Sequence, residues 1–243
     1  MNKFFITERG DIAYQIAEAK KSLRRLFKHG DALLIVTKRL DSILVQELCM
    51  EYRHCTIVHN NITGFGGTYM EEGVAPPEVT INAFNDLVSM GFPEKQLVLR
   101  IDPVIPTIKG TDNAIKIINM CPEYVTRLRF SFIDNYNHIK ALGLPWNSFH
   151  APQECQRYAL DAIKAAARGK SVEACGEPQL AENTGCISMK DYDILGLPRP
   201  ENVDRRGQRK SCMCLDTKTE LLTKPLSCPN GCVYCYYSLG KKL

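Results

Sequence analysis

The sequence lacks the long apolar segments that membrane insertion and export require. No run of apolar residues approaches the roughly 18 that a membrane-spanning helix needs. The apolar run at residues 4–6 is also too short for a secretory signal. These absences predict a cytoplasmic protein with no membrane partner.

The sequence also lacks a large excess of charge of either sign. The 31 Lys and Arg residues against 27 Asp and Glu residues leave a formal net charge of +4. This charge permits an anionic substrate or a nucleic acid but does not argue for either. Basic side chains gather at residues 20–28, on a predicted helix whose other face is apolar. The solvated outer face of a helix explains that run better than an RNA-binding stripe.

Two common functional motifs are missing. The glycine-rich stretch at residues 64–68 does not end in the Gly-Lys-Ser/Thr of a phosphate-binding loop. His54, His59, His138 and His150 have no paired spacing, so we assign none of them to a metal. A phosphate loop is therefore excluded, and a metal-dependent barrel nuclease is disfavoured.

The sequence repeats an apolar run followed by an amphipathic segment at roughly 30-residue intervals. This repeat is typical of βα units with a parallel sheet and right-handed crossovers. We expect a partial or full TIM-like βα barrel over residues 1–196 and a cysteine-rich irregular segment over residues 197–243, packed on the barrel mouth. Strands are predicted at residues 4–6, 33–36, 56–59, 97–101, 128–132 and 171–174. Helices are predicted at residues 12–27, 41–52, 76–88, 111–118 (capped by Thr111 or Asp112) and 152–168.

Polar residues follow most of the predicted strands. In such a barrel the carboxyl ends of the strands gather on one face, where ligands bind. We expect about half of these strand-end residues to line a ligand site and the others to pair among themselves. They are Glu8, Arg9, Lys38, Asn60, Asn61, Arg100, Asp102, Ser131, Asp134, Cys175 and Glu177.

Eleven cysteines are many for a chain without an export signal. In a reducing compartment such clustering favours metal binding over disulfides, and an odd number suits a disulfide framework poorly. Seven of the eleven lie from Cys175 onward. We interpret the other four as small core residues: Cys49, Cys55, Cys121 and Cys155.

The most specific motif lies near the end of the chain. Cys228, Cys232 and Cys235 have the spacing C-x-x-x-C-x-x-C, and Tyr234 directly precedes the last cysteine. Three thiolates so close together converge most simply on a metal centre. Three ligands are one fewer than a 4Fe–4S cluster usually takes from cysteine, which leaves one iron open to a small molecule.

This spacing resembles the cluster loop of radical S-adenosylmethionine (SAM) enzymes. Because the motif lies at the end of the chain, the sequence is similar to an uncharacterised family, a domain of unknown function with a cysteine-rich C-terminus. It is more distantly similar to radical SAM proteins of the spore photoproduct lyase type. Residues 216–227 depart from the family pattern, because they lack its Asp-Ile-Gly. The likeness is carried by short motifs at residues 7–13, 36–38, 63–65, 100–103 and 208–214.

The resemblance implies that SAM binds the open iron of a 4Fe–4S cluster. SAM is then cleaved reductively to a 5′-deoxyadenosyl radical, which acts on an unknown substrate. An electron donor such as a ferredoxin or flavodoxin is implied as a partner. The resemblance also points to Gly66 and Gly67 as contacts of the SAM amino group, although a flexible turn explains them nearly as well. For the SAM carboxylate, the ribose or the substrate, the best strand-end candidates are Arg100, Asp102, Ser131 and Asp134.

A second set of cysteines remains once this triad is set aside: Cys175, Cys186, Cys212 and Cys214. Four thiols are the number of ligands that a fully ligated metal site requires. An auxiliary 4Fe–4S cluster is favoured over structural zinc, because a Cys-x-Cys pair is tight for tetrahedral zinc. Alternatively, Cys175 and Cys186 are core thiols and only the tail binds metal.

Two other functions stay open. Basic residues 205–210, with Lys241 and Lys242, suit a radical SAM protein that repairs or modifies nucleic acid through phosphate contacts. A non-catalytic zinc- or iron–sulfur-binding protein would carry the same cysteines but would not react with SAM.

Overall fold

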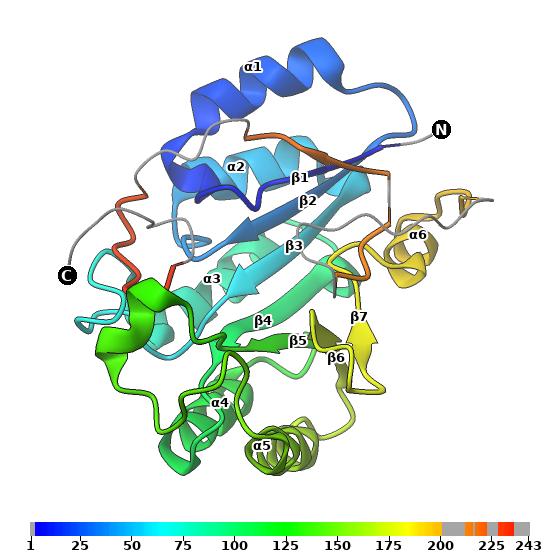
Figure 1. The fold of residues 1–243 in the computed structure, drawn as a ribbon. Helices are drawn as coiled ribbons and strands as arrows, with labels where there is room; N and C mark the ends of the chain where they lie inside the picture. Colours follow the sequence, from blue (N-terminus) through cyan, green and yellow to red (C-terminus); the bar gives the residue numbers. More distant parts are fainter. Residues whose placement is uncertain (1–2, 201–211, 216, 223–227, 236–243) are drawn as a thin grey trace.

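The computed structural model of the chain describes residues 3–200, 212–215, 217–222 and 228–235. Within these ranges, eight parallel strands form one sheet that curls into a half barrel (Figure 1). The order along the sheet is β7-β6-β5-β4-β3-β2-β1-β8. The strands are β1 (Phe4–Ile6), β2 (Ala32–Thr37), β3 (Thr56–Asn61), β4 (Leu97–Val104), β5 (Arg127–Phe132), β6 (Ser171–Cys175), β7 (Asn183–Thr184) and β8 (Lys218–Glu220).

Helices connect successive strands and cover the outer face of the curled sheet (Figure 1). They are α1 (Ile16–Leu26), α2 (Ile43–Glu51), α3 (Pro77–Ser89), α4 (Ile108–Met120) and α5 (Gln153–Ala166), and α6 (Met189–Leu195) follows β7. Short 3-10 helices are η1 (Ile12–Tyr14), η2 (Arg53–Cys55), η3 (Glu94–Gln96) and η4 (Asn137–Leu142). These right-handed βα units give the TIM-like architecture that the repeat predicts.

Both faces of the sheet are buried, which explains why its strands read as almost continuous apolar runs. Alternation along each strand sends one set of side chains, such as Leu33 and Val58, against the outer helices. The neighbouring residues Leu34 and Ile57 point to the concave face. The chain therefore has one core outside the half barrel and a second core inside it.

The concave face is filled near the amino ends of the strands by residues 186–192 and 214–215. The ring of Tyr192 packs edge-on against Phe4, with centroids 4.9 Å apart. Asp191 forms a 2.8 Å ion pair with the buried Arg127. Ser188 and Asp191 cap the start of α6 reciprocally, which fixes this segment in place. This apolar filling does not reach the carboxyl ends of the strands, where polar groups line the concave face.

The six strands and five helices predicted from the sequence are present, with shifted ends. The strands β7 and β8 and the helix α6 were not predicted; β8 belongs to the segment that we expected to be irregular, yet it pairs with β1. The predicted cap of α4 is wrong: Thr107, not Thr111 or Asp112, accepts the Gly110 N–H at 3.1 Å. The helix therefore begins one turn earlier.

The four scattered cysteines divide into two pairs. Cys49 and Cys121 are buried, as expected of core thiols, but Cys55 and Cys155 are partly exposed. Cys55 closes the short helix η2, where its thiol donates to the Tyr52 carbonyl at 3.4 Å, and Cys155 lies in the first turn of α5. Among the described residues, no helix is long and apolar enough to cross a membrane.

Candidate metal and cofactor site

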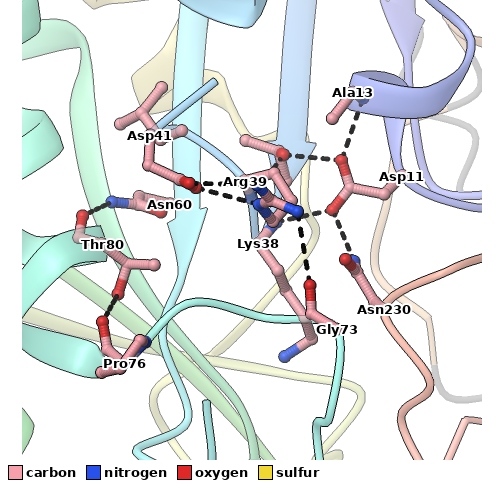
Figure 2. Close-up of polar contacts among 12 residues, drawn as sticks. Asp11, Ala13, Lys38, Arg39, Asp41, Asn60, Gly73, Pro76, Thr80 and Asn230 are labelled. Atoms are coloured by element: carbon pink, nitrogen blue, oxygen red, sulfur yellow. Dashed lines mark hydrogen bonds and ion pairs between the residues drawn. The ribbon is translucent and has the colours of Figure 1, made fainter. Parts of the chain in front are cut away.

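Residues 228–235, which we name the cysteine loop, lie against the loops that follow the carboxyl ends of several strands. Figure 1 shows this segment (red) beside the loop after β3 (cyan) and beside η4 (green). Figure 2 shows that Asn230 meets Asp11, which follows β1. Asn230 Nδ2 donates to Asp11 Oδ2 at 2.9 Å, and Asn230 Oδ1 accepts from the Tyr14 hydroxyl at 3.0 Å.

Asp11 ties the cysteine loop to the end of β2 as well. Its Oδ1 accepts from the Thr37 hydroxyl at 2.7 Å, and its Oδ2 accepts from the Lys38 backbone N–H at 2.8 Å. The same carboxylate caps η1 through the Ala13 N–H at 3.1 Å. A nearly buried carboxylate with this many donors has its position fixed.

A second anchor is Glu71, in the loop between β3 and α3. Its side chain is 1 % exposed. Glu71 Oε1 accepts from Lys38 Nζ and from the Thr63 hydroxyl, each at 2.7 Å, and from the Tyr234 hydroxyl. The Lys38 ammonium also lies 5.6 Å from the centroid of the Tyr234 ring. This group fixes the residue that directly precedes Cys235.

Backbone contacts complete the attachment. The Val233 N–H donates to the Met70 carbonyl at 3.1 Å, and the Gly73 N–H donates to the Asn230 carbonyl at 3.1 Å. A Cβ at Gly73 would overlap the Pro229 carbonyl, so only glycine permits this approach. His138, in η4, donates from Nε2 to the Cys235 carbonyl at 3.0 Å.

The three thiols of the cysteine loop are free and partly buried. Burial raises the pKa of Cys228. Burial also raises the pKa of Cys232, to about 12; the Lys38 ammonium opposes this shift, whereas Glu71 and the other two thiols add to it. The thiols are thus close enough to affect one another electrostatically. Burial alone would lower the pKa of Lys38, but Glu71 and then Cys232 outweigh burial and raise it.

The predicted second set of cysteines is also assembled, on the concave face of the half barrel. Cys175 Sγ and Cys186 Sγ are 3.4 Å apart, and the Cys186 N–H donates to Cys214 Sγ at 3.1 Å. Cys214 also lies close enough to Cys186 and Cys212 to change the pKa of each. A Cβ at Gly185 would lie 2.5 Å from Cys214 Cα, so this glycine allows the two segments to meet. We name this second set the four-cysteine group: Cys175, Cys186, Cys212 and Cys214.

Two guanidinium groups contact Cys186 in the four-cysteine group. Arg100 Nη1 donates to Cys186 Sγ at 3.2 Å, and Arg129 Nη1 donates to the Cys186 carbonyl at 2.6 Å. Hydrogen bonds from Cys175 and Cys214, followed by the two guanidinium groups, hold the pKa of Cys186 well below its usual value. A hydrogen bond from Cys214 lowers the pKa of Cys212 to about 6. These shifts favour the thiolate, the form that binds metals, at Cys186 and Cys212, whereas hydrogen bonding to Cys186 and burial raise the pKa of Cys175 and of Cys214.

Both sets of donors fit a metal–sulfur group chemically, since each joins free thiols to a nearby buried cation: Lys38 for the cysteine loop and Arg100 for the four-cysteine group. Across the described ranges, no three or more His, Cys, Asp or Glu side chains gather at the spacing of a single-ion site.

The strand-end candidates are engaged with one another between the two sets of cysteines. Arg100 donates to Asp102 Oδ2 from Nε at 3.0 Å and from Nη2 at 2.6 Å, and the Ser131 hydroxyl donates to Asp102 Oδ1. Asp134 accepts from His150 Nδ1 at 2.8 Å. Of these, Arg100 connects the mouth of the half barrel to the four-cysteine group.

Packing within the loop after β3 explains the two glycines for which the resemblance implies a SAM contact. A Cβ at Gly66 would overlap the Ala75 carbonyl, and Gly67 has φ 76° and donates its N–H to the Val74 carbonyl at 2.8 Å. A contact with SAM stays a prediction for both.

Sequence reasoning missed several residues that hold the cysteine loop: Asp11, Glu71, Gly73 and Asn230. The signals available were weak, since Asp11 lay within a short motif and Asn230 within the cysteine motif itself. The basic residues of the nucleic-acid alternative, 205–210 with Lys241 and Lys242, lie outside the described residues.

A family described as a domain of unknown function (DUF1848) matches residues 16–237, which is most of the chain. Searches of curated proteins and of solved structures return no match.

Proposed function

The chain belongs to the DUF1848 family, a domain of unknown function. We propose that it is a radical SAM enzyme. In this proposal Cys228, Cys232 and Cys235 bind a 4Fe–4S cluster with one iron left for SAM. The four-cysteine group binds an auxiliary 4Fe–4S cluster, with zinc as the alternative metal. When bound, the first cluster would supply the electron that cleaves SAM to a 5′-deoxyadenosyl radical, and a ferredoxin or flavodoxin would supply that electron to the protein.

One observation supports the proposal above all others: the cysteine loop is held at the carboxyl ends of parallel strands. Asp11 after β1, Lys38 after β2 and Glu71 after β3 all contribute to its attachment. In parallel α/β folds, this is the edge at which ligands bind and chemistry takes place. A cysteine motif that only stabilised the fold would have no need of this edge.

The residues around the cysteine loop suit its proposed task. The Lys38 ammonium, next to Cys232, offsets the negative charge of metal-bound thiolates. An apolar cluster packs around the loop and limits access of water and oxygen to the site. It comprises Met70, Ile133, Ile139, Trp146, Ala151 and Tyr234, with Cys232 and Val233 against it.

The substrate and SAM would lie next to the polar groups between the two sets of cysteines. Asp102, Ser131 and Asp134 offer hydrogen-bond acceptors for hydroxyl or amino groups. Arg100 is already engaged by Asp102 and Cys186, so in this proposal it acts by positioning Asp102. Gly66 and Gly67 would present backbone groups to the SAM amino group.

Cleavage of SAM by the reduced protein tests this function. The experiment incubates the anaerobically purified, dithionite-reduced protein with SAM and measures 5′-deoxyadenosine by chromatography. We expect the product from the wild-type protein and none from a C228A/C232A/C235A variant that keeps the metal of the four-cysteine group. C155A is the matched control, because Cys155 is partly exposed and outside both sets. Equal product from the triple variant would contradict the proposal and favour a non-catalytic metal protein.

A further inference from the structure

His59 is a buried histidine of the concave face that the proposed function does not use. It belongs to β3, and alternation along the strand places it on the same face as Ile57, inside the half barrel. It is 0 % exposed. Neither ring nitrogen has a hydrogen-bond partner among the residues that the structure describes. Buried imidazoles normally satisfy their ring nitrogens, so this one calls for a partner.

The surroundings indicate which partner is suitable. Arg100 and Arg129 are paired in register on the next two strands, and both influence the His59 ring electrostatically. Guanidinium groups have no acceptor, so neither can accept a hydrogen bond from the ring. The negatively charged group that affects His59 is Cys186, the central thiol of the four-cysteine group. Arg129 Nε is likewise buried without a partner among the described residues.

An imidazole ring keeps at least one N–H donor whether it is neutral or protonated. His59 pairs in register with Val98 of β4, and Arg100, two residues further along β4, pairs with Arg129 of β5. Arg100 and Arg129 both donate to Cys186, and Val98 and Cys186 belong to the same buried cluster on the concave face. Donors without acceptors on this face are the pattern that an anionic metal–sulfur group would satisfy.

We propose that His59 donates a ring N–H to the metal–sulfur group held by the four-cysteine group and thereby raises the reduction potential of that group. The inference rests on the proposed function in one respect, namely that a 4Fe–4S cluster occupies these four cysteines. Hydrogen bonds to cluster sulfurs stabilise the more negative, reduced state, which is why they raise the potential. His59 is a positioning residue here, since it binds neither the substrate nor SAM.

The test isolates this cluster in the full-length C228A/C232A/C235A protein, purified anaerobically. His59→Leu removes the donor at similar volume, and His59→Gln keeps an N–H. His54→Leu is the matched control, because His54 is exposed in η2. The measurements are iron and sulfide content, circular dichroism for the fold, and the midpoint potential from an EPR-monitored redox titration.

We expect unchanged iron content in every variant, a midpoint potential shifted to more negative values in His59→Leu, a smaller shift in His59→Gln, and none in His54→Leu. A potential in folded His59→Leu equal to that of the parent would overturn the inference. Loss of iron from a folded His59→Leu variant would also overturn it, because His59 would then be a ligand. If His59→Leu does not fold, the midpoint potential of His59→Gln is compared with that of the parent. A more negative potential in His59→Gln supports the inference, and an equal potential overturns it. Absence of iron from the parent would instead refute the auxiliary cluster itself.

Discussion

Replacing Glu71 by glutamine probes the anchoring of the cysteine loop. The substitution keeps the shape of the side chain but removes the charge that Lys38 pairs with at 2.7 Å. Both partners are nearly buried, with side chains 11 % and 1 % exposed. Removing one partner of a buried ion pair leaves an uncompensated charge and costs about 3–5 kcal/mol. In a chain of this size, a loss of about 3 kcal/mol lowers Tm by about 6–12 °C.

The assay is thermal unfolding of the anaerobically purified protein by circular dichroism, together with its iron content. We expect E71Q to unfold at a lower temperature and to retain less iron, because the carboxylate to which Tyr234 and Lys38 both donate is replaced by an uncharged, weaker acceptor. The matched control is Glu78→Gln, which removes an exposed pair with Lys116 at 3.7 Å. It should change the free energy of unfolding by less than about 0.5 kcal/mol.

A double variant separates the ion pair from other effects. Lys38→Met combined with E71Q removes both charges, so the double variant should be less destabilised than the sum of the single variants. Additive losses, or an E71Q protein with the Tm and iron content of the wild type, would refute the view that this pair holds the cysteine loop.

Three further substitutions test local features. Gly73→Ala should lower the iron content of the cysteine loop, because its Cβ would overlap the Pro229 carbonyl; iron content equal to that of the wild type would contradict the packing described. Gly185→Ala should reduce the metal bound by the four-cysteine group while SAM cleavage continues, because its Cβ would lie 2.5 Å from Cys214 Cα; a full complement of metal at that group would count against this reading. Thr107→Ala should lower the free energy of unfolding by about 1 kcal/mol, which denaturant titration measures, since it removes the cap of α4; no change would show that the cap does not matter.

Sequence reasoning found the elements whose signal is local. The strands β1 to β4 contain buried apolar runs, and such runs are recognisable without knowledge of their neighbours. In β5 and β6, apolar and polar residues alternate over most of the strand, which is also a local signal. By contrast, β7 and β8 have two and three residues, and pairing with the rest of the sheet defines them. The cap at Thr107 was missed because Thr111 and Asp112, a few residues further along, offered competing caps.

The site was only partly predictable for the same reason. Cysteine spacing predicted the set at residues 228–235, and the four-cysteine group was predicted as the clustered cysteines that remain. The anchors are not distinctive by type, and their partners are remote: Asn230 and Asp11 are separated by 219 positions in the chain. His59 was set aside because it has no paired spacing, while its interest comes from burial by residues far along the chain.

EPR of the reduced protein with and without SAM, combined with iron, sulfide and zinc content after anaerobic purification, shows whether the cysteine loop holds a cluster that binds SAM. We expect about eight irons and a signal that SAM changes, because one of two clusters has an open iron. About four irons with a signal changed by SAM would leave zinc, or no metal, at the four-cysteine group. Zinc alone, with no response to SAM, would contradict the catalytic role proposed for the cysteine loop.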